Sequence, residues 1–299
     1  MFYRLSAGAL AGCTLLWLNL GAMPAAAAAY ELPPDGDAVV GVVTDLNLHY
    51  EDTLAGVAQR LGLGYYELLD ANPRVDPWLP GEGTRIQLPT EYVLPSAPRE
   101  GIVINVAEYR LYYYPPDGRR VITFPVGLGR QEYPTPLVRT KVVAKIENPS
   151  WTPTAVSRKE HAAMGDILPA VVPAGPDNPL GHLAMQLALP GYFIHGTNKP
   201  FGVGQSVSQG CIRLYDGHIE TLVELADTGT PVQIVNEPYK VGWRNGDLYV
   251  EVHHPVYGVG SRTDLNERVV EATKNRATAI DWARLEELFE QPTGVPVKL

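Results

Sequence analysis

The sequence predicts a mostly β domain over residues 101–237, a small β-α-α-β unit ahead of it at 40–89, and a mixed C-terminal extension at 238–299. First, residues 101–236 alternate short runs rich in Val, Ile, Tyr and Phe with Pro and Gly turns. Second, apolar residues near position 55 recur at helical spacing. Third, a strand pair followed by two helical stretches begins after residue 238. The Pro-rich residues 90–100 indicate a linker between the first two parts.

The β-α-α-β unit is predicted from two helices and the runs that flank them. Four apolar residues share the i, i+3, i+4, i+7 spacing of one helix face: Leu54, Val57, Ala58 and Leu61. Asp52 or Thr53 is placed to cap this helix. Gly62 or Gly64 is placed to end it. A second helix is expected from Tyr65 to Ala71, where "NP" stops it, and "VVTDL" and "TRIQLP" supply the two strands.

This unit resembles a LysM module in its "DTL…A…L" first helix, its "L…ANP" second helix and its closing "G…IQLP" strand. LysM modules bind the N-acetylglucosamine-containing glycan of cell walls, so the resemblance implies a peptidoglycan anchor. The opening departs from the usual pattern, because "TDLNLHYEDTL" replaces a tyrosine followed by "GDTL". A small packing domain that no longer binds sugar is therefore the alternative.

The mostly β domain is expected to begin with a hairpin, because "GIVINVAEYRLYYY" and "VITFPVGLG" flank the turn "PPDGRR". "TKVVAKIENPSWTP" adds a strand, and "DGHIETLVELAD" is the one helix expected within the domain. In the C-terminal extension, "VGWRNGDLYVEVHHP" predicts a strand pair. Helices are expected there from Thr263 to Asn275 and from Ala277 to Glu290.

The N-terminus has the pattern of a secretory signal peptide. One basic residue, Arg4, precedes an uncharged apolar run that ends in an alanine tract before Tyr30. We therefore expect residues 1–29 to be removed near Ala29. A retained membrane anchor is one alternative, because the run approaches the length of a spanning helix, and "LAGC" ending at Cys13 leaves a lipoprotein as another. Loss of the leader removes Cys13 and leaves Cys211 as the single cysteine of the mature chain.

The amino-acid composition indicates a globular protein and argues against nucleic acid as a partner. Hydrophobic residues make up 45% and charged residues 19%, as in ordinary globular proteins. The net charge of -9 does not supply the basic face that nucleic-acid binding requires. We expect no nucleic-acid partner, and membrane contact only through the signal peptide.

No metal and no cofactor are expected. The single mature cysteine and the scattered histidines lack the spacing of zinc ligands. On a strand, the adjacent His253 and His254 would face opposite sides. His182 is expected to pack at the surface, with a place in the cleft wall as the alternative, and His218 is expected to cap its helix or lie at the surface.

The candidate catalytic residues lie in "YFIHGTNKPFGVGQSVSQGCIRLY", residues 192–215. A thiol attacks an acyl carbon as the thiolate, so Cys211 requires a base, and His195 is placed to serve as one. "FIHG" suits a strand end, and "SQGCIRL" suits the return to an adjacent element. With no acidic residue in the motif, we expect the backbone carbonyl of Gly196 to orient the second ring nitrogen.

Two neighbours of Cys211 complete the candidate site. Gly210 lets the backbone approach a substrate closely, and the N–H groups of Gly210 and Cys211 are expected to face an oxyanion. Arg213 is two residues beyond Cys211, so on a strand it points to the same side and suits a substrate carboxylate. The alternatives are an inert buried cysteine, a structural histidine and an arginine that pairs with a surface acid.

The same stretch, "IHGTN…G…VSQGCIRL", resembles the signature of the L,D-transpeptidase family with its YkuD-type catalytic domain. It is particularly similar to the Gram-negative ErfK/YbiS-like members, which pair a LysM module with that domain and a C-terminal extension. "VGLGR", "NPSWTP", "NPLG" and "GTPVQIVNEP" follow the family's order. The resemblance implies a YkuD-like β-sandwich with a short helix, in a protein of the periplasm.

By this resemblance, Cys211 is the nucleophile and His195 the base, while Ser208, Gly210 and Arg213 shape the substrate site. The implied substrate is peptidoglycan. The thiolate attacks the bond between meso-diaminopimelate and the terminal D-alanine of a stem tetrapeptide, and the thioester passes to an amine. The implied acceptor is another stem's side-chain amine (a 3-3 crosslink), the C-terminal lysine of a small outer-membrane lipoprotein, or a free D-amino acid.

Two departures and two alternatives remain open. Gln209 stands where the family usually has histidine, and "TPLVRT" replaces the more usual "TP.G" loop. A hydrolase with the same Cys–His pair would pass the thioester to water, as a carboxypeptidase or an endopeptidase. A non-catalytic wall-binding protein is the alternative from a different class.

Overall fold

A computed structural model describes residues 27–299. The expected leader, residues 1–29, lies almost entirely outside the described residues, and so does Cys13. Its last two residues belong to strand β1 (Ala28–Glu31), which pairs antiparallel with β8 (Arg120–Pro125). Cleavage after Ala29 would leave Tyr30 and Glu31 of that strand. Within residues 27–299, no helix is both long and apolar enough to cross a membrane.

The central domain is mostly β, as the sequence predicts. Nine strands form one sheet in the order β1-β8-β7-β6-β15-β10-β11-β12-β14. All neighbouring pairs are antiparallel except β6 with β15 and β12 with β14. Their bounds are β6 Gly101–Asn105, β7 Arg110–Tyr114, β8 Arg120–Pro125, β10 Arg139–Glu147, β11 Leu183–Leu187, β12 Phe193–His195, β14 Ile212–Arg213 and β15 Pro231–Val235.

One predicted strand run is in fact two strands. Residues 101–114 turn through the 3₁₀ helix η1 (Val106–Glu108), and Tyr109 adopts a left-handed φ of +52°. Neither Gly nor Pro marks this reversal, so no turn signal is present at these residues. β6 and β7 therefore pair with each other, and β7 pairs with β8.

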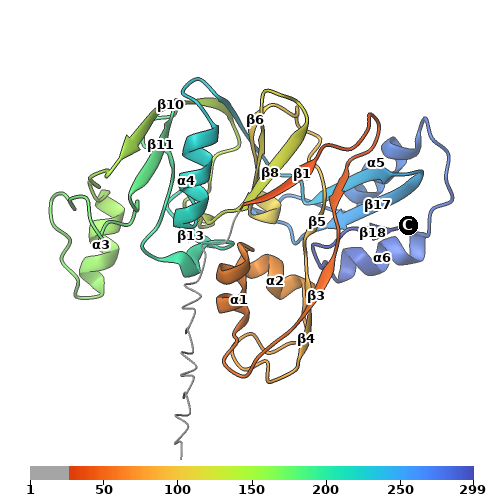
Figure 1. Cartoon of the computed structure of the whole chain (residues 1–299), viewed down its shortest axis with the longest axis horizontal. Helices are drawn as coiled ribbons and strands as arrows, with labels where there is room; N and C mark the ends of the chain where they lie inside the picture. The colour runs from red at the N-terminus through yellow and green to blue at the C-terminus, as the bar shows by residue number, and fades with distance from the viewer. Residues whose placement is uncertain (1–26) are drawn as a thin grey trace, which may run out of the picture.

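The central domain contains two α-helices, of which α4 (Asp216–Leu225) lies beside β11 and α3 (Ala155–Ala163) lies beyond the ends of β10 and β11 (Figure 1). The expected helix is α4, whose Ile219 and Leu222 join the main core with sheet residues such as Ile104 and Ile194. The second, α3, was not predicted, and it lies in the connection between β10 and β11. A short parallel pair, β9 (Leu128–Gly129) and β13 (Ser206–Ser208), and the 3₁₀ helix η2 (Pro200–Gly202) lie near β14.

The N-terminal unit has the predicted β-α-α-β order. Its elements are β3 (Thr44–Asn47), α1 (Leu54–Leu61), α2 (Tyr65–Ala71) and β4 (Arg85–Leu88), with β3 and β4 antiparallel. Thr53 caps α1 by accepting from the Gly56 N–H at 3.0 Å, and Gly62 ends the helix with a φ of +67°. The apolar face forms a separate core that includes Leu54, Val57 and Ala58.

The Pro-rich residues 90–100 are packed rather than free. They contain β5 (Glu91–Val93), which pairs with β2 (Val39–Gly41). Tyr92 and Val93 are buried, as is usual for apolar side chains that pack against other parts of the protein.

The C-terminal extension folds against this segment. β16 (Tyr239–Arg244), β17 (Asp247–Val252) and β18 (Val297–Lys298) form a sheet that packs on α5 (Arg262–Thr273) and α6 (Trp282–Glu290). The strand pair and both helices were predicted. α6 begins later than expected, because Asp281 caps it by accepting from the Arg284 N–H at 2.9 Å.

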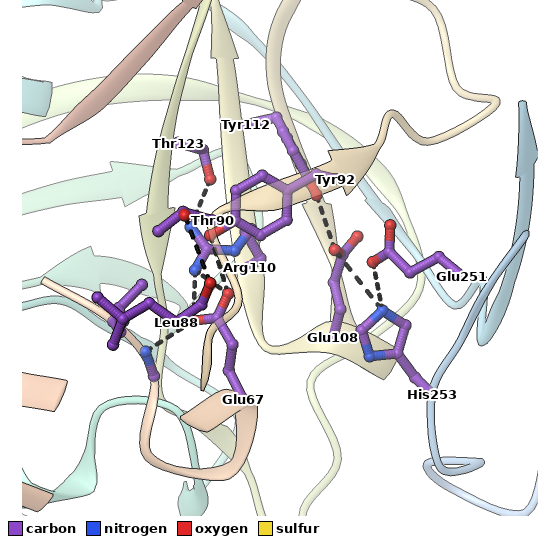
Figure 2. Close-up of polar contacts among 12 residues, drawn as sticks. Glu67, Leu88, Thr90, Tyr92, Glu108, Arg110, Tyr112, Thr123, Glu251 and His253 are labelled. Carbon is purple, nitrogen blue, oxygen red and sulfur yellow. Dashed lines mark hydrogen bonds and ion pairs between the residues drawn. The ribbon is translucent and has the colours of Figure 1, made fainter. Parts of the chain in front are cut away.

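Buried ion pairs join the three parts (Figure 2). Glu67 of α2 pairs with Arg110 of β7, and the guanidinium also lies 4.3 Å from the centre of the Tyr92 ring. Lys240 of β16 lies 2.6 Å from Glu108 and 2.8 Å from Glu251. Because these charges are desolvated, separating the parts would leave them uncompensated, so the three parts pack as one body.

Candidate active site

One cleft of about 1500 Å³ brings together the predicted side chains. His195, Ser208, Gln209, Cys211 and Arg213 all line it. Their convergence follows from the parallel pairing of β12 with β14, which sets His195 directly opposite Arg213 and leaves Cys211 one residue before β14. The predicted return of the chain to an adjacent strand is therefore observed.

His195 is held as a neutral base. Its ring is buried, and Nδ1 lies 2.6 Å from the Gly196 carbonyl oxygen. Because a carbonyl only accepts, Nδ1 carries the proton and Nε2 keeps its lone pair. Burial, and then the nearby Arg213 charge, lower the pKa of His195 to about 3, against the opposing effect of the Gly196 and Leu180 backbone.

Cys211 is a free and partly buried thiol. Burial raises its pKa above the ordinary value, although the Phe193 backbone and the Arg213 charge partly offset this. Sγ donates to the Gly191 carbonyl at 3.6 Å, so in this conformation the thiol is directed to Gly191 rather than to His195. This hydrogen bond must break before the thiol gives its proton to His195, and catalytic hydrogen bonds often form only when substrate binds.

Ser208 and Gly210 shape the turn ahead of the thiol. Ser208 Oγ donates to the Cys211 carbonyl at 2.6 Å and accepts from the Gly210 N–H at 3.1 Å. Of the two amides expected to face an oxyanion, that of Gly210 is therefore already engaged, which leaves that of Cys211. Gly210 has a φ of +104°, and a Cβ there would lie 2.8 Å from the Tyr192 ring. Only glycine fits without strain.

Arg213 carries positive charge into the cleft. Within residues 27–299 its buried Nε has no hydrogen-bond partner. A buried donor without a partner is costly, and a carboxylate accepts from a guanidinium in a bidentate manner. The residue is placed to receive an anionic group beside Cys211.

Gln209 connects the cysteine turn to α3. Its Oε1 accepts from Thr154 Oγ1 at 2.7 Å and from Ser157 Oγ at 3.2 Å. Its Nε2 donates to Glu160 at 3.3 Å, and Arg130 donates to the other oxygen of that carboxylate at 2.6 Å. From the sequence, Gln209 was noted only as a departure from the family's usual histidine. Its role in attaching α3, which forms a wall of the cleft, to the cysteine turn was not predicted. The sequence signal for α3 was Thr154, a helix-capping residue type that stands directly before "AVSRKE".

Of the remaining histidines, His161 lines the same cleft, where its Nδ1 lies 2.7 Å from Asp166 Oδ2, and the others lie outside the cleft. His182 Nε2 lies 2.8 Å from the carboxylate of Glu220 on α4. His218 is buried, which corrects the surface placement predicted for it, because its ring packs edge-on against Phe124 and Tyr215.

One cluster within residues 27–299 has the spacing of metal ligands: Glu108, Glu251 and His253. The Lys240 ammonium lies 2.6 Å from Glu108 and 2.8 Å from Glu251, in the position that a cation would take. Burial alone would raise the pKa of Glu251, but Lys240 and His253 outweigh it and lower that pKa. The cluster is thus balanced by a lysine and fits a structural ion pair better than a metal.

Residues 99–234 match the family model described as the YkuD L,D-transpeptidase catalytic domain. The chain is 42% identical to the probable L,D-transpeptidase YcfS of Escherichia coli K12, over 92% of this chain and 89% of that protein. It is 40% identical to the probable L,D-transpeptidase ErfK/SrfK of Salmonella typhimurium, over 91% of each. It also resembles the solved catalytic domain of the E. faecium L,D-transpeptidase with a TM-score of 0.35 and 21% identity, covering 47% of this chain and 99% of that one.

Proposed function

Because the chain belongs to the L,D-transpeptidase family, we propose that it acts on peptidoglycan stem tetrapeptides through a thioester on Cys211. The observation that carries this proposal is the meeting of Cys211, His195 and Arg213 in one cleft. The three groups supply a nucleophile, a base and a carboxylate anchor.

The first step transfers the acyl group to the enzyme. Arg213 binds a carboxylate of the donor peptide, and His195 Nε2 takes the thiol proton as Cys211 Sγ bonds to the carbonyl carbon of meso-diaminopimelate. The Cys211 amide donates to the oxyanion. The C–N bond to D-alanine then breaks, and the imidazolium returns the proton to the departing amine, which leaves a neutral thioester and a neutral His195.

The second step passes the acyl group to an amine. The acceptor amine attacks the thioester carbon and gives its proton to His195. The imidazolium returns this proton to Cys211 Sγ as the C–S bond breaks, which restores the thiol and the neutral His195. The acceptor is a stem side-chain amine, a lipoprotein lysine or a free D-amino acid. Exclusion of water from the cleft decides whether the thioester meets an amine or water.

The three parts of the chain that flank the central domain are proposed to serve a periplasmic wall enzyme. The β-α-α-β unit at 40–89 is proposed to act as a LysM-like glycan anchor, and residues 1–29 as the signal peptide that exports the chain. The C-terminal extension is proposed to hold the central domain rigid through the Lys240 ion pairs.

A product analysis tests the proposal. The mature protein is incubated with disaccharide-tetrapeptide, with and without an added D-amino acid, and the products are weighed by mass spectrometry beside a Cys211→Ala control. Loss of D-alanine with an exchanged or dimeric product, absent from the control, is expected. Tripeptide alone would assign hydrolysis instead. No Cys211-dependent product would contradict acyl transfer and favour a wall-binding protein.

A further inference from the structure

An aromatic cluster joins the N-terminal unit to the central domain at the edge of the catalytic cleft. The ring centroids of Trp78 and Phe201 lie 5.9 Å apart, with an interplanar angle of 27°. Tyr65 lies 5.4 Å from Phe201 and 6.5 Å from Trp78. Trp78 remains 56% exposed and Phe201 49% exposed. Two adjacent rings thus keep about half of their surface open to solvent while they contact each other.

The backbone on both sides of this cluster is fixed. Tyr65 N–H donates to the Val203 carbonyl at 3.4 Å, and Tyr66 N–H donates to the Gly204 carbonyl at 3.2 Å. Gly204 has a φ of +77°, and a Cβ there would lie 2.3 Å from the Tyr65 nitrogen. Only glycine permits this approach, so the loop that carries Phe201 is held against α2.

The backbone at Trp78 is fixed by hydrogen bonds within the N-terminal unit. The Asp76 carboxylate accepts from the Trp78 and Leu79 N–H groups, each at 2.9 Å. The platform is therefore preorganised, which lowers the entropy lost on binding a ligand.

The cluster is continuous with the catalytic cleft. Phe201 lines the same cleft as Cys211. Gln59 of α1 lines that cleft and also a neighbouring hollow of about 600 Å³. Asn198 also lines both cavities, whereas Asn178 lines only the hollow. The Phe201 ring, on which Trp78 stacks, thus lines the same cleft as the neutral amide groups of Gln59 and Asn198.

We propose that this platform, formed by Trp78 and Phe201 with Gln59 and Asn198 beside it, is a saccharide subsite for the disaccharide that carries the stem peptide. The apolar C–H face of an N-acetylated hexosamine packs on an aromatic ring, while its hydroxyl and acetamido groups require neutral hydrogen-bond partners. The inference rests on the proposed function, because the stem peptide in the cleft is what brings its sugar to this edge.

The platform belongs to neither unit alone, since Trp78 comes from the N-terminal unit and Phe201 from the central domain. Sugar recognition is therefore coupled to the peptide site across the interface. A stem peptide that lacks its disaccharide would lose these contacts.

A binding assay tests the subsite without catalysis. The Cys211→Ala chain is titrated with the N-acetylglucosamine tetramer by calorimetry. Added Trp78→Leu or Phe201→Leu changes are expected to weaken binding about tenfold. Trp282→Leu is the matched control, because Trp282 is a 51% exposed tryptophan on α6, and binding should be unchanged. Absence of binding, or binding that neither platform change weakens, would overturn the proposal.

A kinetic comparison separates failure of this inference from failure of the proposed function. The ratio of kcat/KM for disaccharide-tetrapeptide to kcat/KM for free tetrapeptide is measured for each chain. We expect a ratio of about ten or more, lowered toward one by Trp78→Leu and by Phe201→Leu. Equal use of both substrates by the unaltered chain would refute the subsite and leave the transferase intact. No Cys211-dependent turnover of either substrate would refute the proposed function itself, and this inference with it. Unfolding temperatures of the variants identify any loss that reflects misfolding.

Discussion

The resting protonation state of Cys211 and His195 makes the most specific prediction. Burial raises the pKa of the thiol, while burial and Arg213 lower the pKa of His195 to about 3. The pair therefore rests as neutral thiol and neutral imidazole rather than as thiolate and imidazolium. His195 then acts only at the moment of attack, when Cys211 turns away from Gly191.

The magnitude follows from the thiolate fraction. An ordinary thiol with a pKa of about 8.5 is roughly 3% thiolate at pH 7, and the raised pKa of Cys211 puts its fraction lower still. Each pH unit below the pKa changes that fraction tenfold. Alkylation of the mature chain by iodoacetamide is thus expected to accelerate about 100-fold between pH 6 and pH 8.

The dependence of kcat/KM on pH below 7 gives a second test of the same protonation state. A base whose pKa is lowered to about 3 stays neutral as pH falls from 7 to 5. The kcat/KM for D-alanine release should therefore show no His195 inflection near pH 6.5. Cys211→Ala controls for alkylation at other groups. An alkylation rate that is flat from pH 5 to pH 8 would reveal a preformed thiolate–imidazolium pair and refute the reasoning.

Three further predictions concern single substitutions. Lys240→Met should cost about 3–5 kcal/mol of unfolding free energy by denaturant titration, because it leaves buried carboxylates uncompensated; a loss below about 1 kcal/mol would contradict this. Gly210→Ala should lower kcat/KM at least tenfold with the fold retained by circular dichroism, because a left-handed backbone and the Tyr192 ring oppose a Cβ; unchanged activity would show that the turn adapts. Gln209→Ala should raise KM several-fold more than it changes kcat in steady-state assays, because it frees α3 from the cysteine turn; an equal loss in both constants would assign Gln209 to the chemistry.

Local signals in the sequence predicted much of the fold. Thr53 and Gly62 mark the ends of α1 because capping depends on neighbours a few residues away. The reversal at Tyr109 was missed because a non-glycine residue adopts a left-handed φ there only with tertiary support. Residues 91–93 looked like part of a linker, since pairing with β2 depends on a partner about fifty residues distant.

The candidate site was predictable where chemistry and spacing coincide. His195 and Arg213 lie on β12 and β14, and Cys211 directly precedes β14. The pairing of these two strands therefore brings the three residues together. The engagement of the Gly210 N–H by Ser208 was not predictable, because it depends on a side-chain rotamer. The contact of Trp78 with Phe201 was equally hidden, since it joins two separately folded parts.

The central claim is that Cys211 carries the acyl group of the stem peptide. The most direct measurement is the intact mass of the mature protein mixed briefly with disaccharide-tetrapeptide, followed by peptide mapping. The account predicts a covalent adduct of the donor minus D-alanine, located on the peptide that contains Cys211 and absent from the Cys211→Ala chain. An adduct on another residue, or D-alanine release that persists in Cys211→Ala, would contradict it.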